Sequence, residues 1–199
     1  MLRPQLAPAE TQILTLATAV AAADTINEAG GLSAGIKWPN DLVIDGKKVC
    51  GILVEMSSEA DRVNYVVIGT GINYSQKAED FPPEIRDRAI SMKAASEGQG
   101  RPEGTTGFDR LSVVRLFLKK LDDIVKLVLS NDNKKIIEMW RARSVTLGKK
   151  VCFKLRDSGY TGTAIDITGD GRLIVDCDDG IRRELLSGEV SVRGVYGYF

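Results

Sequence analysis

An Asp-Gly pair between two apolar runs is the feature that most restricts how this chain can fold. Asp45-Gly46 separates Leu42–Ile44 from Val49–Glu55, and this arrangement is typical of a β-hairpin with a two-residue turn. A further β-branched run, Val63–Ile68, ends at Gly69-Thr70-Gly71, where we expect another turn. Three short strands with tight turns therefore predict a mixed or antiparallel sheet.

Segments with helical periodicity lie on both sides of this predicted sheet. Residues 8–29 carry an Ala-rich apolar stripe that stops at Gly30-Gly31 and suits close packing on a sheet. Residues 108–129 carry a second stripe, which we expect to be core, with Thr106 and Asp109 spaced as a capping box. Shorter helices are expected at 83–94 and 133–143. The expected buried face of the 108–129 helix consists of Leu111, Val114, Phe117, Leu118, Leu121, Val125 and Val128.

The pattern changes near Leu147 to short strands separated by glycine turns. Because five short strands in about fifty residues bury little as a flat sheet, we expect a small SH3-like β-barrel. The fold class is therefore α+β: a mixed/antiparallel sheet with packed helices in residues 1–146, followed by the SH3-like β-barrel in residues 147–199. The five predicted strands are Lys150–Leu155, Gly159–Ile167, Arg172–Cys177, Gly180–Leu185 and Val190–Arg193.

The composition excludes several kinds of chemistry. The 199 residues contain no histidine, so a Ser-His-Asp triad and a histidine zinc site are ruled out. The 27 basic residues balance 27 acidic ones, which argues against nucleic acid as a partner. Cys50, Cys152 and Cys177 lack the spacing of a disulfide framework or zinc ribbon. With no signal segment and no long apolar run, a cytoplasmic protein without a membrane partner is expected.

Polar and glycine residues concentrate around the predicted hairpin. In Trp38-Pro39-Asn40-Asp41, an amide and a carboxylate at a strand entrance can orient a nucleotide and hydrated Mg²⁺. Lys48 can meet a phosphate or carboxylate as a point charge. Gly51 allows a flat ligand to approach the backbone, and the Asn73 amide can read an adenine edge. Taken singly, these pieces also fit an ordinary hairpin with a polar entrance.

Three segments together resemble the signature of the biotin protein ligase family in order and spacing: Lys37-Trp-Pro-Asn-Asp41, Lys48-Val-Cys-Gly-Ile-Leu-Val-Glu55 and Gly69-Thr-Gly-Ile-Asn73. The run Leu-Ser-Gly-Glu-Val-Ser at 186–191 resembles the family's small C-terminal domain. The resemblance implies a fold like that of class II aminoacyl-tRNA synthetases and biotin ligases. It also implies that ATP and biotin form biotinyl-5′-AMP, from which biotin passes to a lysine of the biotin carboxyl carrier protein of a carboxylase.

The resemblance also assigns roles to individual residues. Lys48 would be the catalytic residue, contacting the biotin carboxylate and the activated phosphate. Trp38 would pack beneath the site and Asp41 would hold Mg²⁺. Independently of the resemblance, Cys50 lies beside Gly51, where a small residue is needed, and is expected to be a packed thiol. The biotin-binding residues would be Lys48, Gly51, Ile52 and Leu53, and the nucleotide-binding residues would be Asn40, Asp41, Gly69, Gly71 and Asn73.

Two other interpretations stay open. Lipoate ligase-like enzymes share the fold and the adenylate chemistry, although the Trp-Pro-Asn-Asp and Lys-Val-Cys-Gly-Ile-Leu segments favour biotin. The second interpretation is a non-catalytic ligase fragment that acts as a binding module. Exposed strand edges also allow a homodimer.

The Gly-Arg-Gly-Arg-x-Gly loop that folds over the adenylate in this family does not occur in the 199 residues. We therefore interpret the chain as the C-terminal part of a ligase, beginning inside the catalytic domain. Because the arginines of that loop would neutralise phosphate charge, we predict that this chain forms little or no biotinyl-5′-AMP. Chromatography of labelled ATP products measures this, and biotinylation of a carrier domain at a normal rate would contradict it.

Overall fold

The first sheet contains four strands in a computed structural model that describes residues 1–59, 62–100, 108–155, 158–187 and 193–194. The strands follow one another in sequence and every neighbouring pair is antiparallel. This arrangement confirms the predicted sheet. The strands are β1 (Gly35–Lys37), β2 (Asp41–Ile44), β3 (Lys47–Ser58) and β4 (Val63–Ile72).

One of the two predicted turns in this sheet is confirmed and the other is wrong. Asp45 and Gly46 both have positive φ, 48° and 74°, as a type I′ hairpin turn requires. Gly69-Thr70-Gly71 instead lies inside β4, where Gly69 pairs with Leu53 and Gly71 with Gly51. Glycines that pair with a neighbouring strand do not end their own strand, but they leave its surface without side chains.

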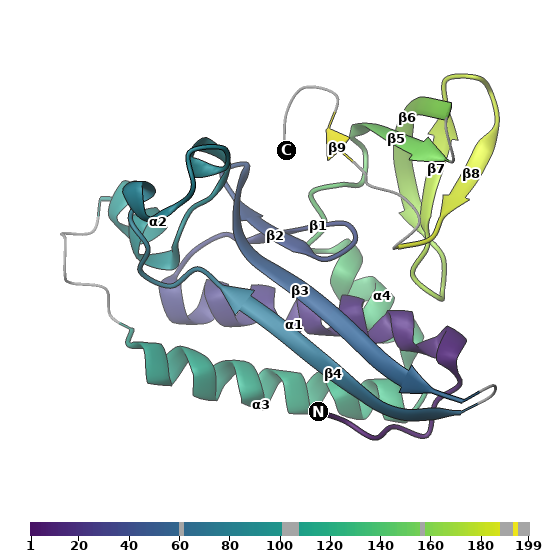
Figure 1. Cartoon of the computed structure of the whole chain (residues 1–199), viewed down its shortest axis with the longest axis horizontal. Helices are drawn as coiled ribbons and strands as arrows, with labels where there is room; N and C mark the ends of the chain where they lie inside the picture. The colour runs from purple at the N-terminus through teal and green to yellow at the C-terminus, as the bar shows by residue number, and fades with distance from the viewer. Residues whose placement is uncertain (60–61, 101–107, 156–157, 188–192, 195–199) are drawn as a thin grey trace.

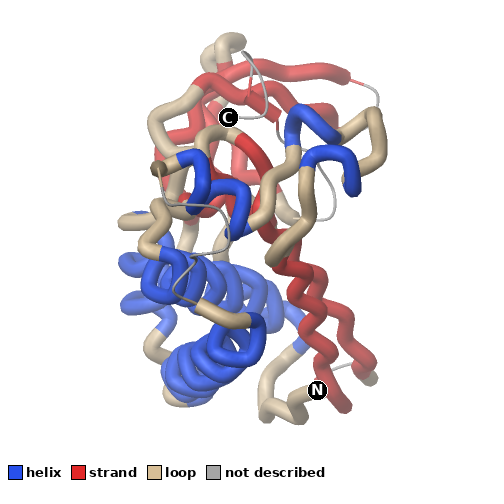
Figure 2. The backbone as a smooth tube through the Cα atoms, turned by 90° about the vertical axis from the view of Figure 1, so that its left-hand side faces the viewer, coloured by secondary structure: helices blue, strands red, loops and turns tan. Residues whose placement is uncertain are grey.

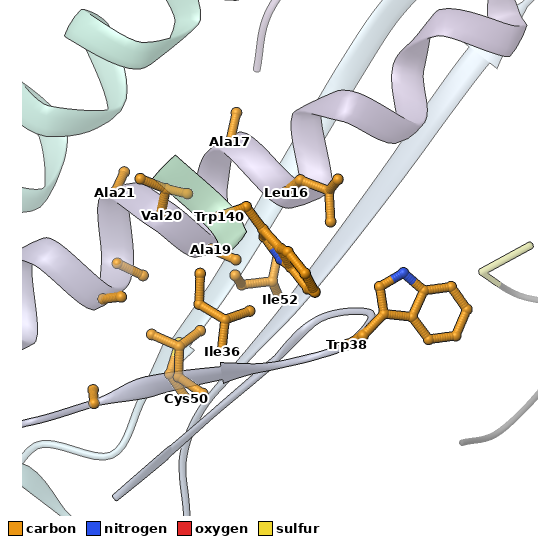
Figure 3. Close-up of a cluster of buried hydrophobic side chains, with 14 of the residues drawn as sticks. Leu16, Ala17, Ala19, Val20, Ala21, Ile36, Trp38, Cys50, Ile52 and Trp140 are labelled. Atoms are coloured by element: carbon orange, nitrogen blue, oxygen red, sulfur yellow. The ribbon is translucent and has the colours of Figure 1, made fainter. Parts of the chain in front are cut away.

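Helices cover one face of the first sheet (Figures 1 and 2). The 3₁₀ turn η1 (Pro8–Thr11) leads into α1 (Gln12–Gly30), which ends where Gly31 adopts a left-handed conformation. Helix α1 is buried almost all round because it packs against the sheet, α3 (Arg110–Leu129) and α4 (Asn133–Arg141). Its side chains join Ile36, Ile52 and Trp140 in the core (Figure 3). Within the part of the chain that is described, no helix has the length and apolar character needed to span a membrane.

The buried face of α3 agrees only in part with the predicted one, of which Val125 and Val128 are buried. Val113, Ile124, Val125 and Val128 are buried, whereas Leu111, Val114 and Leu118 are 56%, 46% and 57% exposed. The helix has several overlapping apolar rows, and its packing on α1 decides which of them is buried. The helix N-cap is Asp109, which accepts a hydrogen bond from the Ser112 N–H. The predicted capping partner Thr106 lies outside the described residues.

The segment between β4 and α3 contains short helical pieces rather than the single helix expected at 83–94. They are η2 (Ala78–Asp80), η3 (Arg86–Arg88) and α2 (Met92–Gly98). Ser91 caps α2 by accepting a hydrogen bond from the Ala94 N–H. Residues just before α2 also pair with β3, and this contact matters for the site described below.

The second sheet has five antiparallel strands in the order β8-β7-β6-β5-β9. Among the described residues, β8 and β9 do not pair, so the sheet is open rather than the closed barrel that was expected. Most of the predicted strand Val190–Arg193, and most of the 186–191 run, lies outside the described residues. The strands are β5 (Lys150–Leu155), β6 (Ser158–Ile167), β7 (Leu173–Cys177), β8 (Arg182–Leu185) and β9 (Arg193–Gly194).

The turn between β6 and β7 joins the second sheet to the first part of the chain. The Gly171 carbonyl accepts hydrogen bonds from Trp38 Nε1 at 3.1 Å and Gln12 Nε2 at 3.3 Å. Gly171 has φ +91°, and a Cβ built on it would lie 2.7 Å from Leu16 Cδ1. Trp38 is only 1% exposed, which confirms its predicted packing role. One glycine carbonyl therefore connects α1, the tryptophan before β2 and the second sheet.

Replacing Gly171 with alanine should destabilise the protein more than the same change at Gly180. Both glycines have positive φ, but nothing lies within 4 Å of a Cβ at Gly180. Gly171→Ala adds a collision with the buried Leu16, so its loss of unfolding free energy should exceed that of Gly180→Ala by about 1–2 kcal/mol. Urea unfolding of the two variants measures the difference, and equal losses would show that Gly171 is not closely packed.

Candidate active site

A row of residues without large side chains crosses the first sheet. Asp41 on β2 pairs with Gly51 on β3, and Gly51 pairs with Gly71 on β4. The next pair on this face is Leu53 with Gly69. Directly paired residues share a face of the sheet. The three glycines therefore leave a strip of bare backbone on the face opposite the helices, with Asp41 at one end.

Lys48 lies over this strip and forms an ion pair with Asp41. A Cβ built on Gly51 would lie 3.0 Å from both Cε and Nζ of Lys48 and 3.7 Å from Asp41 Oδ1. The missing side chain of Gly51 therefore gives the Lys48 side chain room to cross the strand. The Lys48 side chain remains 40% exposed and that of Asp41 16%, so the ammonium group is accessible to a ligand.

A β-bulge places Lys48 on this face. In a regular strand, residues 48 and 51 would lie on opposite faces because side chains alternate. Here Leu42 pairs with Cys50 and Val43 with Lys48, so the β2–β3 register shifts at Val49. The extra residue reverses the alternation, as bulges do beside active sites. Sequence reasoning missed this bulge, and its only local signal is the pair of adjacent apolar residues Val49 and Cys50.

Cys50 points into the core beside the site. It is 1% exposed, which confirms the predicted packed thiol. Loss of water around the sulfur raises the pKa of Cys50 to about 12, although the nearby Lys48 charge acts in the opposite direction. A thiol with this pKa is protonated at neutral pH and is a poor nucleophile.

Ile52 and Asn40 are placed differently from the other predicted ligand-binding residues. The Ile52 side chain is 2% exposed and lies in the helix-covered core (Figure 3). Asn40 Nδ2 donates to the Ile52 carbonyl at 2.7 Å, and the Ile52 N–H donates to the Asn40 carbonyl at 2.9 Å. These two residues therefore bind each other behind the glycine strip. A contact between Ile52 and a ligand would not use its side chain.

Asn73 lies at the end of β4 and its amide is also engaged. Nδ2 donates to the carbonyls of Lys48 at 3.2 Å and Ile90 at 3.1 Å. An Asn73 contact to a nucleotide would therefore have to use Oδ1. The segment around Ile90 pairs with β3 through an isolated bridge between Lys48 and Ala89. Nothing in the sequence pattern indicated that this segment lies beside the site.

Apolar side chains continue the exposed face beyond the glycines. Leu53 is 59% exposed, Val67 38% and Tyr65 40%. The site thus combines the Lys48–Asp41 ion pair, a bare centre and a far end where these apolar side chains lie beside the exposed Glu55, which pairs with Val67 on the same face. Such a surface suits an elongated ligand with one anionic and one apolar part. Among the described residues, no group of three or more cysteine, aspartate or glutamate side chains could hold a metal ion by itself.

Comparison with known proteins finds relatives with this fold, and two family models match the segments that contain the candidate site and the second sheet. Residues 2–73 match the Biotin/lipoate A/B protein ligase family, and residues 146–193 match the Biotin protein ligase C terminal domain. The chain is 34% identical over 183 residues to the Bifunctional ligase/repressor BirA of Bacillus subtilis, covering 92% of this chain. It is 32% identical over 143 residues to the Biotin--[acetyl-CoA-carboxylase] ligase of Mycobacterium tuberculosis, covering 71% of this chain and 47% of the relative.

Solved structures extend this similarity across both sheets. Biotin protein ligase from Aquifex aeolicus superimposes with a TM-score of 0.77 at 27% identity, over 96% of this chain and 80% of that chain. The same enzyme in complex with biotin and ATP gives a TM-score of 0.76, over 96% of this chain and 76% of that chain.

The fold and the site define a protein of the biotin and lipoate ligase class. More narrowly, the chain belongs to the biotin protein ligase family. It spans about half the length of the curated relatives it matches, 54% in the case of the Bacillus subtilis protein.

Proposed function

We propose that this chain supplies the lysine-bearing part of a biotin protein ligase active site and the C-terminal domain of that enzyme. The observation that carries the proposal is the Lys48–Asp41 ion pair above the strip formed by Gly51, Gly69 and Gly71. An accessible cation over bare backbone can receive a carboxylate or phosphate. The apolar side chain of Leu53 lies further along the same face.

The proposed reaction has two steps. A carboxylate oxygen of biotin attacks the α-phosphorus of ATP and pyrophosphate leaves, which gives biotinyl-5′-AMP. The amine of the acceptor lysine then attacks the acyl carbon, AMP leaves, and an amide forms with loss of a proton. Both steps develop negative charge on oxygen, which a fixed ammonium such as that of Lys48 stabilises without imidazole. The residues of this chain therefore need no histidine for the role proposed for them.

Biotin is proposed to lie along the strip with its carboxylate at Lys48 and its rings toward Leu53. Gly51 would allow the close approach. Ile52 supports this position from the core side, since its side chain faces away from the strip. The polar end of the ligand therefore meets a charge, and its apolar end meets exposed apolar surface.

The nucleotide is proposed to bind beside biotin, over the parts of the strip that β2 and β4 contribute. The proposed contacts come from Asn40, Asp41, Gly69, Gly71 and Asn73. A Mg²⁺ ion would arrive on the phosphates of ATP and take Asp41 as its protein ligand, since Mg²⁺ commonly uses one or two carboxylates and keeps its other ligands from phosphate and water. When bound, it would neutralise part of the phosphate charge.

We place the domain boundary of this proposal near Leu147, with residues 1–146 in the catalytic domain and 147–199 in the SH3-like C-terminal domain. Two observations support it: strands of the second sheet come only from residue 150 onward, and the second family match begins at residue 146. The proposed protein partner is a biotin carboxyl carrier protein with its acceptor lysine. Pairing between two copies of the chain stays a prediction.

Competition between biotin and lipoate separates the proposed function from the lipoate ligase alternative. The experiment uses a protein that contains this chain together with the Gly-Arg-Gly-Arg-x-Gly loop. We expect unlabelled biotin to displace labelled biotin at concentrations at least about a hundredfold below those needed for lipoate, because misplaced polar groups in a built site are costly. If lipoate displaces the label at lower concentrations than biotin, the substrate is lipoate rather than biotin. Binding of neither ligand would favour the non-catalytic module.

Lys48→Ala in the same protein should abolish most adenylate formation while leaving the fold intact. Removing a charge that acts on developing oxyanions typically lowers kcat by about 10²–10³-fold. The folding cost should be small because the ion pair with Asp41 is partly exposed.

Lys47→Ala is the matched control, since Lys47 is the exposed neighbour on the same strand. Biotin-dependent exchange of pyrophosphate into ATP measures the rate, and circular dichroism monitors the fold. Unchanged exchange in Lys48→Ala would remove Lys48 from the site.

A further inference from the structure

The position of the Lys48 ammonium depends on a bulge that the β2–β3 ladder does not hold by itself. Val49 has no partner of its own in the β2–β3 register. A bulged residue leaves backbone groups without ladder partners, and buried backbone groups need other hydrogen bonds. The backbone around Val49 must therefore be held from outside the hairpin.

Asn73 and the segment just before α2 make these hydrogen bonds. The Asn73 N–H donates to the Val49 carbonyl at 2.8 Å, and Asn73 Nδ2 donates to the Lys48 carbonyl at 3.2 Å. The Ile90 N–H donates to the same Lys48 carbonyl at 2.9 Å. Two consecutive carbonyls of the bulge are thus bound by one residue, and the first of them is bound twice.

Asn73 also holds the segment that assists it. Its Nδ2 donates to the Ile90 carbonyl at 3.1 Å, and its own carbonyl accepts from the Met92 N–H at 2.8 Å. The two Nδ2 hydrogens therefore bridge the backbones of Lys48 and Ile90. An amide provides two donors on one nitrogen, whereas a carboxylate at this place would direct oxygen at two carbonyl oxygens.

We propose that Asn73 is a positioning residue that holds the Val49 bulge and so fixes the Lys48 ammonium beside Asp41. This role acts through the backbone and is separate from any contact of Asn73 with a nucleotide. Its catalytic consequence rests on the proposed function, but its geometric consequence does not. Asn73→Asp should therefore disturb Lys48 in the chain alone, in the absence of any substrate.

The test measures the reactivity of Lys48 in the 199-residue chain. Limited acetylation by an N-hydroxysuccinimide ester, followed by peptide mass spectrometry, gives the ratio of the Lys48 rate to the Lys47 rate. A lysine side chain held in an ion pair over the strip is less free to meet the reagent than an unrestrained one, so it reacts more slowly. In Asn73→Asp we expect the Lys48/Lys47 ratio to rise about threefold, the size of effect that a partly exposed ion pair has on its lysine.

Two controls separate positioning from general loosening. Asn64→Asp makes the same substitution in β4, the strand that Asn73 directly follows. Among the described residues, the Asn64 amide donates to Glu59 Oε1 at 3.5 Å and not to the Lys48 or Val49 carbonyl. It should leave the ratio unchanged. The rate of Lys120, which pairs with Glu28 on the helical side of the molecule, should also not change. A rise at Lys120 equal to that at Lys48 would mean that the substitution loosens the whole fold, and it would overturn the proposal.

A double substitution tests whether Asn73 acts through the ion pair. Asp41→Asn should raise the Lys48/Lys47 ratio by itself, and adding Asn73→Asp should raise it no further, because the pair is already broken. Independent effects that multiply would overturn the proposal. An unchanged ratio in folded Asn73→Asp would also overturn it. If Asn73→Asp does not fold, Asn73→Ala, which removes the donors without adding repulsion, gives the same readout.

The catalytic consequence is tested in the protein that carries the Gly-Arg-Gly-Arg-x-Gly loop. If Asn73 acts through Lys48, Asn73→Asp should lower pyrophosphate exchange at least about fivefold more in the Lys48 protein than in Lys48→Ala, where only the loss of the proposed nucleotide contact remains. Equal losses in both backgrounds would indicate a separate contact and overturn the proposal. Absence of exchange in the unsubstituted protein would instead refute the proposed function, while the labelling result in the chain alone would stand.

Discussion

Close packing of α1 against the first sheet is the constraint on which the rest of the structure depends. Alanines Ala17, Ala19 and Ala22 are fully buried in this helix. The helical repeat puts Ala17 on the opposite side of the helix from Ala19 and Ala22, as Figure 3 shows for Ala17 and Ala19. Small side chains therefore allow close packing both on the sheet and on the other helices. The buried hydroxyls of Thr18 and Thr25 donate to carbonyls within the helix, so the helix brings no unsatisfied polar group into the core. Helices α3 and α4 and the turn at Gly171 all pack on α1.

This packing leaves the other face of the sheet available for chemistry. The helices hold β2, β3 and β4 from one side, so glycines on the opposite side can stay bare without weakening the core. The strip of Gly51, Gly69 and Gly71 is thus a backbone surface held in place by the pairing of β3 with β4. Rigid elements hold functional groups more precisely than loops do. The second sheet is tied to the same framework, because Gly171 binds the tryptophan that precedes Asn40 and Asp41.

The Val49 bulge brings the residues of the candidate site together on one face of the sheet. Without it, the alternation of β3 would direct Lys48 and Gly51 to opposite faces. With it, the lysine lies above the glycine and beside Asp41. The bulge in turn depends on hydrogen bonds from Asn73 and Ile90, residues that are far from Lys48 in the sequence. The position of Lys48 therefore depends both on its local strand geometry and on residues distant in the sequence.

The sequence alone determined most of the strands and helices and the family. Asp45-Gly46 fixed a hairpin because both turn residues can adopt positive φ, and the signature segments identified the family. Tertiary structure decided what depends on partners distant in sequence. It selected the buried row of α3, kept Gly69-Thr70-Gly71 inside a strand, left β8 and β9 unpaired with each other among the described residues, and turned Ile52 into the core. Side-chain alternation can be read along one strand, but a register shift depends on its neighbours, and only the folded sheet contains them.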